Sequence, residues 1–381
     1  MISVDDYRAA LIDWRNEALA RSGERSPTLD EQRANARALG AAGLAGPTWP
    51  VEFGGVGGDQ MHQAVFDEVL HGVERLLTPR LVTEGICAPT VRDFGTPEQH
   101  SRFLPDMVSG ATIWGQLLSE PGAGSDLGSV STRARRVPGG WELSGQKVWT
   151  SRADVADYSL ALVRTGDPDG HRRKALSMMI VDMSAPGIQV RPLREMTGDA
   201  LFNEVFLDEV FVPDDALVGE ENAGWAVLLG MLGHERDAVG AAGAANTIYR
   251  ARGRELHRRI SGLDDRGRAE LQHDLVRLIA REEAHLALAE AVMNARREYR
   301  DDRPFGSLSK VSVAILAATA GDLSSRIDGT ALRAPEADDD VLASAESLLR
   351  APMVGIAGGT TEIQKNTIAR QILRVDEKVR S

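Results

Sequence analysis

The chain has 381 residues and a formal net charge of -12 at pH 7, with 43% hydrophobic and 26% charged residues. These fractions are ordinary for a globular protein, but the length exceeds what one core usually organises, so two or three packed domains are expected. The acidic balance argues against nucleic acid and against an anionic membrane surface as partners. No run of about 18 apolar residues occurs, so no membrane-spanning helix is expected.

The sequence contains one cysteine, Cys87. A single cysteine cannot form a disulfide within the chain, which fits a reducing compartment. Its apolar surroundings predict a buried, inert thiol. We therefore expect a cytoplasmic protein.

The N-terminal region is predicted to be helical over roughly its first 110 residues. Apolar side chains recur at helical spacing at Tyr7, Leu11, Trp14 and Ala18. Thr28 or Asp30 is suited to cap a second helix that runs from Leu29 to Leu39, and Gly40 is expected to end it. Further helices are expected over residues 61–76 and from Pro97 to about Leu104.

The middle of the chain is predicted to form strands, because the apolar pattern changes to a period of two at about Ile113. Turns rich in Gly, Pro and Asp divide the expected strands. These strands cover residues 113–118, 141–149, 158–163, 176–181, 188–190 and 204–212. Gly166 to Gly170 is expected to be a surface loop.

Long helical patterns return at Trp225. They predict helices over residues 225–259, 264–300, 308–326, 341–349 and 362–373. Helices followed by strands and then by helices indicate an α+β fold, not alternating βαβ units. The predicted domains are a helical domain at 1–111, a β domain at 112–222 and a helical bundle at 223–381.

Three segments carry the functional signal. Leu118-Ser-Glu-Pro-Gly-Ala-Gly-Ser-Asp126 follows a predicted strand, and its small residues let backbone N–H groups approach an anionic or polar ligand. The other two segments are Trp149-Thr-Ser151 and Gly358-Gly-Thr-Thr-Glu-Ile-Gln364. Together they resemble the acyl-CoA dehydrogenase family, and the resemblance covers nearly the whole chain.

The resemblance implies a fold and a reaction. It implies a helical N-terminal domain, a β-barrel-like middle domain and a C-terminal four-helix bundle. The implied activity is FAD-dependent α,β-dehydrogenation of an acyl-CoA thioester, in which a carboxylate removes the α-proton and a hydride passes to flavin N5. Electrons would then pass to an electron-transferring flavoprotein, in fatty acid or steroid side-chain degradation.

The resemblance also assigns ligand contacts. The implied FAD contacts are Gln116, Leu118, Ser119, Gly124, Ser125, Trp149, Thr150, Ser151, Thr360 and Glu362. Leu118 and Ser119 are expected to offer backbone groups, and Trp149 is expected to flank the ring, although a core aromatic is the alternative interpretation of Trp149. The implied substrate contacts are Ser125, Arg236, Gly358 and Gly359. The Gly358 N–H is expected to stabilise the enolate oxygen.

Glu235 is the candidate for the catalytic base. Many family members carry the base as a Glu just before the Gly-Thr pair, where this chain has Gly358. A second family pattern, similar to the isovaleryl and long-chain enzymes, has Glu before Arg on the first C-terminal helix, and this chain has Glu235 and Arg236 there. The alternative is that both are ordinary charges on a helix surface. Gly358 also removes bulk beside the acyl chain, which suits a branched or bulky substrate.

Some family features are missing. The Arg-x-x-Phe-Gly turn that holds FAD pyrophosphate is not found after the Glu235 helix, and Arg326 to Thr330 replaces a Gly-rich segment that meets the adenine half. These absences resemble a bacterial branch that assembles as α2β2. The expected assembly is therefore a homotetramer or an α2β2 heterotetramer. The alternative functions are a subunit that binds FAD only with a partner chain, or a flavin oxidase or monooxygenase on the same fold.

Two other sets of polar residues are also consistent with an ordinary solvated surface. Glu282 and His285 have the i, i+3 spacing of di-iron bundles, but other such pairs lie on the same predicted helix or far away in the chain, so no metal site is expected. A solvated helix face is predicted instead. A basic cluster comprises Arg250, Arg252, Arg254, Arg258 and Arg259. It is expected to be solvated, and it is also the best candidate to pair with pyrophosphate or CoA phosphates.

Overall fold

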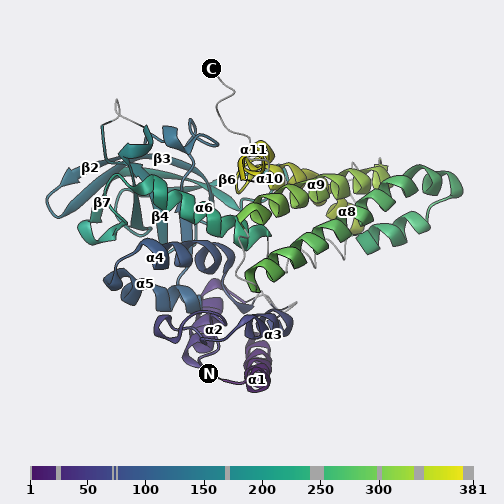
Figure 1. Ribbon diagram of the computed structural model, residues 1–381, viewed down its shortest axis with the longest axis horizontal. Helices are drawn as coiled ribbons and strands as arrows, with labels where there is room; N and C mark the ends of the chain where they lie inside the picture. Colours follow the sequence, from purple (N-terminus) through teal and green to yellow (C-terminus); the bar gives the residue numbers. More distant parts are fainter. Residues whose placement is uncertain are drawn as a thin grey trace. The chain divides into compact units, whose positions relative to one another are not determined.

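The computed structural model describes residues 2–22, 27–70, 73, 76–167, 172–240, 253–297, 303–329 and 339–371 (Figure 1). The chain divides into two compact units. The first unit comprises Met1–Leu193 and Ala200–His234, and the second comprises Arg194–Asp199 and Glu235–Ser381. The division into three domains at 111 and 222 stays a prediction.

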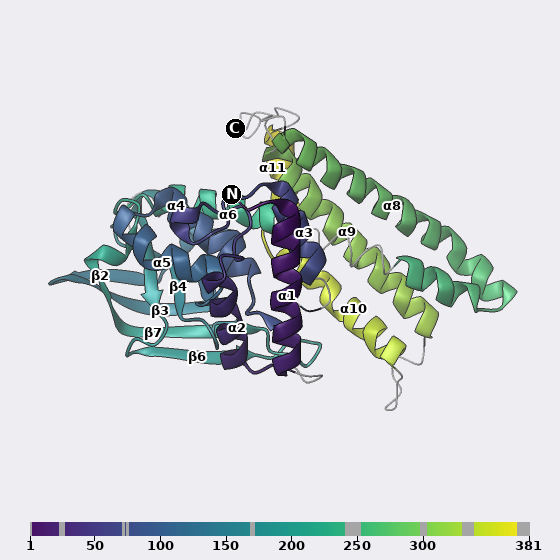
Figure 2. The same cartoon turned by 90° about the horizontal axis from the view of Figure 1, so that it is seen from below.

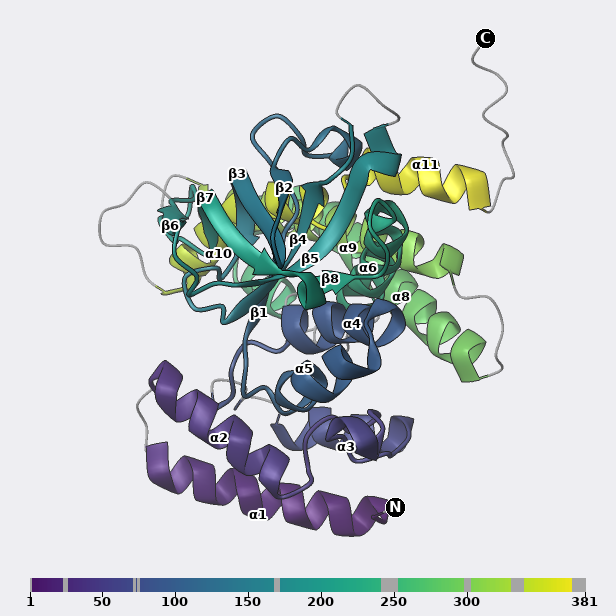
Figure 3. The ribbon, with the colours of Figure 1, turned by 90° about the vertical axis from the view of Figure 1, so that its left-hand side faces the viewer.

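The N-terminal part of the first unit is helical, as predicted. Its helices are α1 (Val4–Ser22), α2 (Leu29–Ala41), α3 (Gln60–Leu70), α4 (Ala88–Phe94) and α5 (Pro97–Ser109). The four apolar residues expected on one face of the first helix are all buried, and so is Cys87. Figure 3 shows α4 and α5 between the sheet and the group formed by α1, α2 and α3.

The ends of two helices differ from the prediction. Thr28 caps α2 in a capping box with Glu31, but the helix continues past Gly40 to Ala41. A Cβ at Gly40 would lie 2.7 Å from the Cβ of Ser109, so this glycine allows α2 to approach the end of α5 closely and does not end the helix. The helix α5 also continues through Pro105.

The rest of the first unit is built on one mixed sheet of eight strands in the order β6-β7-β3-β2-β4-β5-β8, with β1 paired to β4. The strands are β1 (Trp114–Leu117), β2 (Arg133–Val137), β3 (Gly140–Ser151), β4 (Tyr158–Arg164), β5 (Leu176–Asp182), β6 (Ile188–Leu193), β7 (Phe202–Pro213) and β8 (Leu217–Val218). Figure 2 shows β2, β3, β7 and β6 side by side.

Two strands, β2 and the short β8, were not predicted from the sequence. The sequence of β2 is Arg-Ala-Arg-Arg-Val, in which Ala134 is buried between exposed arginines, so no apolar alternation marks it. Its position in the sheet comes from pairing with β3, to which it is joined by a tight turn at Gly139. The predicted loop at 166–170 lies largely outside the described residues.

The second unit is helical. The helix α6 (Gly224–Gly240) crosses from the first unit into the second at Glu235, and residues 253–261 are again helical. The predicted stretch 241–252 between them lies outside the described residues. The remaining helices are α8 (Asp265–Arg297), α9 (Arg303–Asp328), α10 (Asp339–Ile356) and α11 (Thr361–Gln371).

The helix α9 lies between α8 and α10 (Figure 2). It begins five residues earlier than predicted, at Arg303, and α10 continues through Pro352. The apolar core of this unit is formed by Leu256, Ile260, Leu271, Leu275, Leu278, Leu316, Ala320 and Leu323. Among the residues that the structure describes, no helix has the length and apolar character needed to cross a bilayer.

Candidate functional site

The small-residue loop after β1 is folded into a tight turn. The N–H of Glu120 donates to the Ala123 carbonyl at 2.9 Å, and the N–H of Ala123 donates back to the Glu120 carbonyl at 3.0 Å. Beyond this turn, Gly124 and Ser125 are exposed, and a Cβ added to Gly124 would meet open space. The turn therefore holds the two predicted ligand-contact residues at the surface without filling the space beside them.

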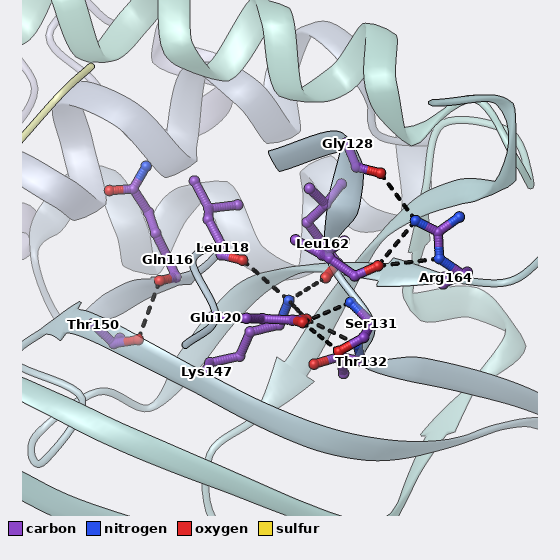
Figure 4. Close-up of polar contacts among 11 residues, drawn as sticks. Gln116, Leu118, Glu120, Gly128, Ser131, Thr132, Lys147, Thr150, Leu162 and Arg164 are labelled. Atoms are coloured by element: carbon purple, nitrogen blue, oxygen red, sulfur yellow. Dashed lines mark hydrogen bonds and ion pairs between the residues drawn. The ribbon is translucent and has the colours of Figure 1, made fainter. Parts of the chain in front are cut away.

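A buried ion pair, Glu120 with Lys147, holds this turn against the sheet (Figure 4). The Lys147 Nζ donates to Glu120 Oε1 at 2.8 Å and to the carbonyls of Leu118 and Leu162 at 3.1 and 2.6 Å. Both side chains are almost fully buried. The three donated bonds use the full donor capacity of the ammonium group.

Backbone donors complete the environment of Glu120. Its Oε2 accepts the N–H of Ser131 at 2.6 Å, and its Oε1 accepts the N–H of Thr132 at 2.8 Å. Burial by itself raises the pKa of Glu120, but the Lys147 charge and these hydrogen bonds lower the pKa to about 2. Burial lowers the pKa of Lys147 to about 8 against the opposite effect of Glu120. We interpret the pair as ionised at neutral pH.

Arg164 fixes the far end of the same loop. Its guanidinium donates to the carbonyls of Gly128 and Val130, at 3.0 and 2.9 Å, and the side chain is buried (Figure 4). The loop from Leu118 to Val130 is thus held at both ends by buried cations that bind backbone carbonyls.

Trp149 is presented to solvent by an irregularity in β3. The β3–β7 register shifts between Lys147 and Thr150, so that two residues of β3 lie opposite one residue of β7. Such a bulge redirects side chains. Trp149 has a φ of 60° and is 62% exposed. The alternative of a core aromatic is therefore wrong.

The predicted contacts at 116–119 and 149–151 lie next to one another. The Thr150 hydroxyl donates to the Gln116 carbonyl at 3.4 Å, and the Val148 N–H donates to the Ser119 carbonyl at 2.9 Å. Figure 4 shows the Gln116 amide pointing away from Thr150. Its Nε2 is buried and has no hydrogen-bond partner among the described residues. Because the carbonyls of Leu118 and Ser119 already accept hydrogen bonds, their N–H groups are the ones we expect to face a ligand.

In the second unit, Glu235 lies beside the glycine that replaces the alternative base. Gly358 has a φ of +68°, and a Cβ built on it would lie 3.3 Å from Oε1 of Glu235 and 3.5 Å from Cε of Lys310. Glu235 and Arg236 are both partly buried and both have interaction partners. The carboxylate of Glu235 therefore lies next to the main chain of Gly358.

The turn between α10 and α11 contains the remaining predicted contacts. The Gln364 amide donates to the Gly358 carbonyl at 2.8 Å. The Thr360 hydroxyl accepts the N–H of Ile363 at 3.2 Å, so Thr360 caps the start of α11. Glu362 is exposed in the first turn of that helix. Within the described part of the chain, the N–H of Gly358 has no acceptor in a turn or loop.

One expectation about other polar groups is wrong, and a second is wrong at one residue. Glu282 and His285 are buried, not solvated: they are 6% and 1% exposed. Glu282 Oε1 and both ring nitrogens of His285 lack hydrogen-bond partners among the described residues. Arg259 is not a solvated cation either, because it pairs with the nearly buried Asp328 and with Glu255.

Within the basic cluster, Arg254 and Arg258 are exposed, as expected. Arg250 and Arg252 of the basic cluster lie outside the described residues. In the part of the chain that is described, no group of three or more His, Cys, Asp or Glu side chains is arranged to hold a metal ion.

Sequence reasoning missed two lysines, Lys147 and Lys310. Both are buried, at 0% and 4% exposure. For Lys147 a signal existed, since it is the one charged residue between Leu143 and Trp149 of a predicted strand. Lys310 carries a comparable signal, since it is the one charged residue between Leu308 and Gly321 of a predicted helix.

Comparison with known proteins gives the family. Three family models match, described as the acyl-CoA dehydrogenase N-terminal domain over residues 9–111, middle domain over 115–210 and C-terminal domain over 222–373. The acyl-CoA dehydrogenase IpdE1 of Mycolicibacterium smegmatis is 32% identical over 415 residues, covering 100% of both chains. The chain belongs to the acyl-CoA dehydrogenase family.

Other relatives match a shorter part of the chain or have a lower sequence identity. Acyl-CoA dehydrogenase FadE34 of Mycobacterium tuberculosis is 46% identical over 237 residues, which are 62% of this chain and 32% of that protein. Among solved structures, a variant of the Tcur3481-Tcur3483 steroid ACAD has a TM-score of 0.77 at 27% identity, covering 97% of this chain and 99% of that chain. The ChsE4-ChsE5 complex of Mycobacterium tuberculosis has a TM-score of 0.77 at 26% identity, covering 99% and 100%.

This acyl-CoA dehydrogenase is an oxidoreductase, and the cofactor of the family is FAD. Its first unit contains features that fit a flavin. An exposed Trp149, a buried amide nitrogen of Gln116 without a partner among the described residues, and open space beside Gly124 occur on adjoining segments. A flat, polar-edged ring needs such an aromatic neighbour and such donors.

Proposed function

We propose that this acyl-CoA dehydrogenase removes the α-proton of an acyl-CoA thioester with Glu235. The observation that carries the proposal is the 3.3 Å between Glu235 Oε1 and the Cβ position of Gly358. A carboxylate thus occupies the place beside the residue where many family members carry the base. Glu235 supplies that group from a different helix, α6.

The chemistry requires more than a carboxylate. A thioester α-proton is a very weak acid, so the site must stabilise the enolate oxygen with fixed donors and exclude water from the base. The Gly358 N–H is the proposed donor, and the partial burial of Glu235 supports a base that is shielded from water. When bound, FAD would provide the hydride acceptor, its N5 atom.

The ligand contacts are part of the same proposal. Gln116, Ser119 and Trp149 would hold the flavin, together with the other cofactor contacts Leu118, Gly124, Ser125, Thr150 and Ser151. Thr360 and Glu362 are further proposed cofactor contacts. Ser125, Arg236, Gly358 and Gly359 would contact the substrate. Open space beside Gly124 and the absence of a side chain at Gly358 support these assignments.

A bulky substrate is the proposed class. The neighbour named as a steroid ACAD supports a steroid side-chain CoA thioester. An electron-transferring flavoprotein is the proposed electron acceptor. A cytoplasmic location also belongs to the proposal, and its support is a free, buried Cys87 as the only cysteine.

The variant Glu235→Gln tests the base. Its amide keeps the shape and loses the basicity, so turnover should fall by about 100- to 10,000-fold while flavin and CoA-ligand binding stay intact. The measurement is anaerobic bleaching of the flavin spectrum by the acyl-CoA that reduces the unmodified enzyme. Glu270→Gln, which changes an exposed carboxylate on α8, is the matched control and should react normally. Near-normal bleaching by Glu235→Gln would disprove the base assignment.

A second candidate is a subunit that retains FAD only with a partner chain. Its support is the neighbour solved as the ChsE4-ChsE5 complex, together with the missing Arg-x-x-Phe-Gly turn. In this candidate the assembly is an α2β2 heterotetramer, and in the first proposal it is a homotetramer.

A further inference from the structure

Lys310 is a buried lysine next to the proposed base. It lies on α9 with 4% exposure, and lysine is rarely buried to this extent unless paired. Its Cε and the Oε1 of Glu235 both lie within 4 Å of the same point, the Cβ position of Gly358. Burial lowers the pKa of Lys310, and the charge of Glu235 raises it. The terminal carbon of the Lys310 side chain and the carboxylate of Glu235 thus flank one glycine.

The same lysine holds the end of α10. Its Nζ donates to the carbonyl of Val354, two residues before the helix ends at Ile356. The last carbonyls of a helix have no donor within the helix and carry the negative end of its dipole, so a lysine there is favourable on both counts.

Two neutral side chains hold the neighbouring carbonyls of this turn. The Thr361 hydroxyl donates to the Gly355 carbonyl at 3.3 Å, and the Gln364 amide donates to the Gly358 carbonyl at 2.8 Å. Lys310 is therefore the one charged donor among these three contacts. This difference separates an electrostatic role from a purely structural one.

We propose that Lys310 is a positioning residue for proton transfer: it fixes the turn that presents the Gly358 N–H and places a positive charge beside the Glu235 carboxylate. The inference rests on the proposed function, because it takes Glu235 as the base. A cation at this position favours the ionised, proton-accepting form of the carboxylate. It keeps that form available at lower pH than an isolated buried carboxylate would.

Other titratable side chains lie on the helices around α9. The helix packs against α8, α10 and α11. Their titratable side chains include Glu282 and His285 on α8, Arg350 on α10, and Glu362 and Lys365 on α11. Within the described residues, Glu235 is the one charge that shifts the pKa of Lys310. The Lys310–Glu235 coupling is therefore open to a test by single substitutions.

The test compares Lys310→Met with Lys310→Arg, and uses Thr361→Val as the matched control for a lost carbonyl contact. The measurement is the pH dependence of flavin reduction by the acyl-CoA that bleaches the unmodified enzyme. In Lys310→Met the acid limb should move about 1–2 pH units higher, because an opposite charge within about 4–6 Å lowers a carboxyl pKa by that order. In Lys310→Arg and Thr361→Val the limb should stay in place.

A second readout does not depend on turnover. Infrared difference spectra identify the carboxyl band that Glu235→Gln removes, and its pH midpoint should move upward in Lys310→Met alone. Thermal unfolding reports how far each variant loosens the turn. Unmoved midpoints in Lys310→Met, with a Tm loss equal to that of Thr361→Val, would mean that the lysine only clamps the helix end, which overturns the inference. Normal turnover by Glu235→Gln would instead disprove the assignment of Glu235 as the base.

Discussion

Glu282 on α8 carries a carboxyl group that is 6% exposed, and burial raises its pKa to about 7. The neighbouring His285 is also buried, which lowers its pKa. A helix face that the sequence predicts to be solvated is thus an interior polar site. The spacing of the pair shows which side chains share a face, but only the packing of the neighbouring helices determines whether that face meets water.

The raised pKa of Glu282 predicts an unusual pH dependence of stability. Relative to an ordinary value of 4.5, the folded state binds the proton more tightly, so the stabilisation is complete below pH 4.5 and is lost as the pH rises through about 7. The shift corresponds to about 3 kcal/mol. Relative to wild type, Glu282→Gln should therefore gain about that much stability between pH 4.5 and 8. The measurement is the free energy of urea unfolding at both pH values.

The control for this prediction is Glu270→Gln, which changes an exposed carboxylate on the same helix. Its stability difference from wild type should be nearly the same at pH 4.5 and 8. If Glu282→Gln behaved in the same way, the carboxyl group would titrate as an ordinary solvated one, and its burial would have no energetic consequence.

At the scale of elements, the Glu120–Lys147 pair connects the loop after β1 to β3. It ties Leu118, whose carbonyl binds Lys147, to the strand that contains Trp149 and Thr150. One buried interaction therefore orders two segments that the resemblance assigns to the flavin. Neither segment by itself contains both charges, so this connection exists only in the folded sheet.

Removing the Lys147 cation should greatly lower the free energy of unfolding. Lys147→Met leaves the Glu120 carboxylate buried without its counter-ion, and such a loss typically costs about 3–5 kcal/mol. Urea unfolding at pH 7 measures this cost, and flavin absorbance of the purified variant should show reduced FAD content. Arg135→Met removes an exposed ion pair with Glu142 on the neighbouring strands. This control should cost no more than about 1 kcal/mol.

The Glu120–Lys147 pair also predicts the direction in which stability changes with pH. Because the folded pKa of Glu120 is lowered to about 2 from 4.5, its stabilisation is present above pH 4.5 and is lost as the pH falls toward 2. Lys147→Met should be less sensitive to acid over that window than wild type. Equal losses of stability in acid would show that the pair does not govern acid stability.

At the scale of the whole molecule, the main question is whether one chain type retains the cofactor. Models of the N-terminal, middle and C-terminal domains of the family all match this chain, but the turn expected to hold pyrophosphate is absent after the Glu235 helix. Arg303-Pro-Phe-Gly306 does not replace that turn in sequence order, because it opens α9, beyond α8.

The visible spectrum of the purified chain distinguishes the two assemblies. If this chain forms a homotetramer, it should purify yellow, and one of several acyl-CoAs should bleach it anaerobically. Oxygen consumption in place of bleaching would favour the oxidase or monooxygenase alternative. A colourless chain that gains flavin absorbance on addition of a partner subunit would support the α2β2 arrangement. Light scattering gives the mass of the species in each case.

The order of the helices and strands and the family of this protein could be predicted from the sequence alone. Periodicity predicted the order of helices and strands, because amphipathic faces repeat at 3.6 or 2 residues whatever they pack against. Short motifs identified the family, which the full-length relative confirmed. The replacement of a base by Gly358 and the presence of Glu235 could be read from single positions. The Glu235 assignment itself stays a prediction.

Only the tertiary structure determined which polar groups are buried and what they touch. The strand β2 has too many arginines to show alternation, Gly40 permits a helix contact and does not end the helix, and Glu282 faces the interior. The partners of Lys147 and Lys310 lie on segments far away in the sequence. Burial and charge pairing depend on distances in space, and local sequence patterns carry no information about which distant segments meet.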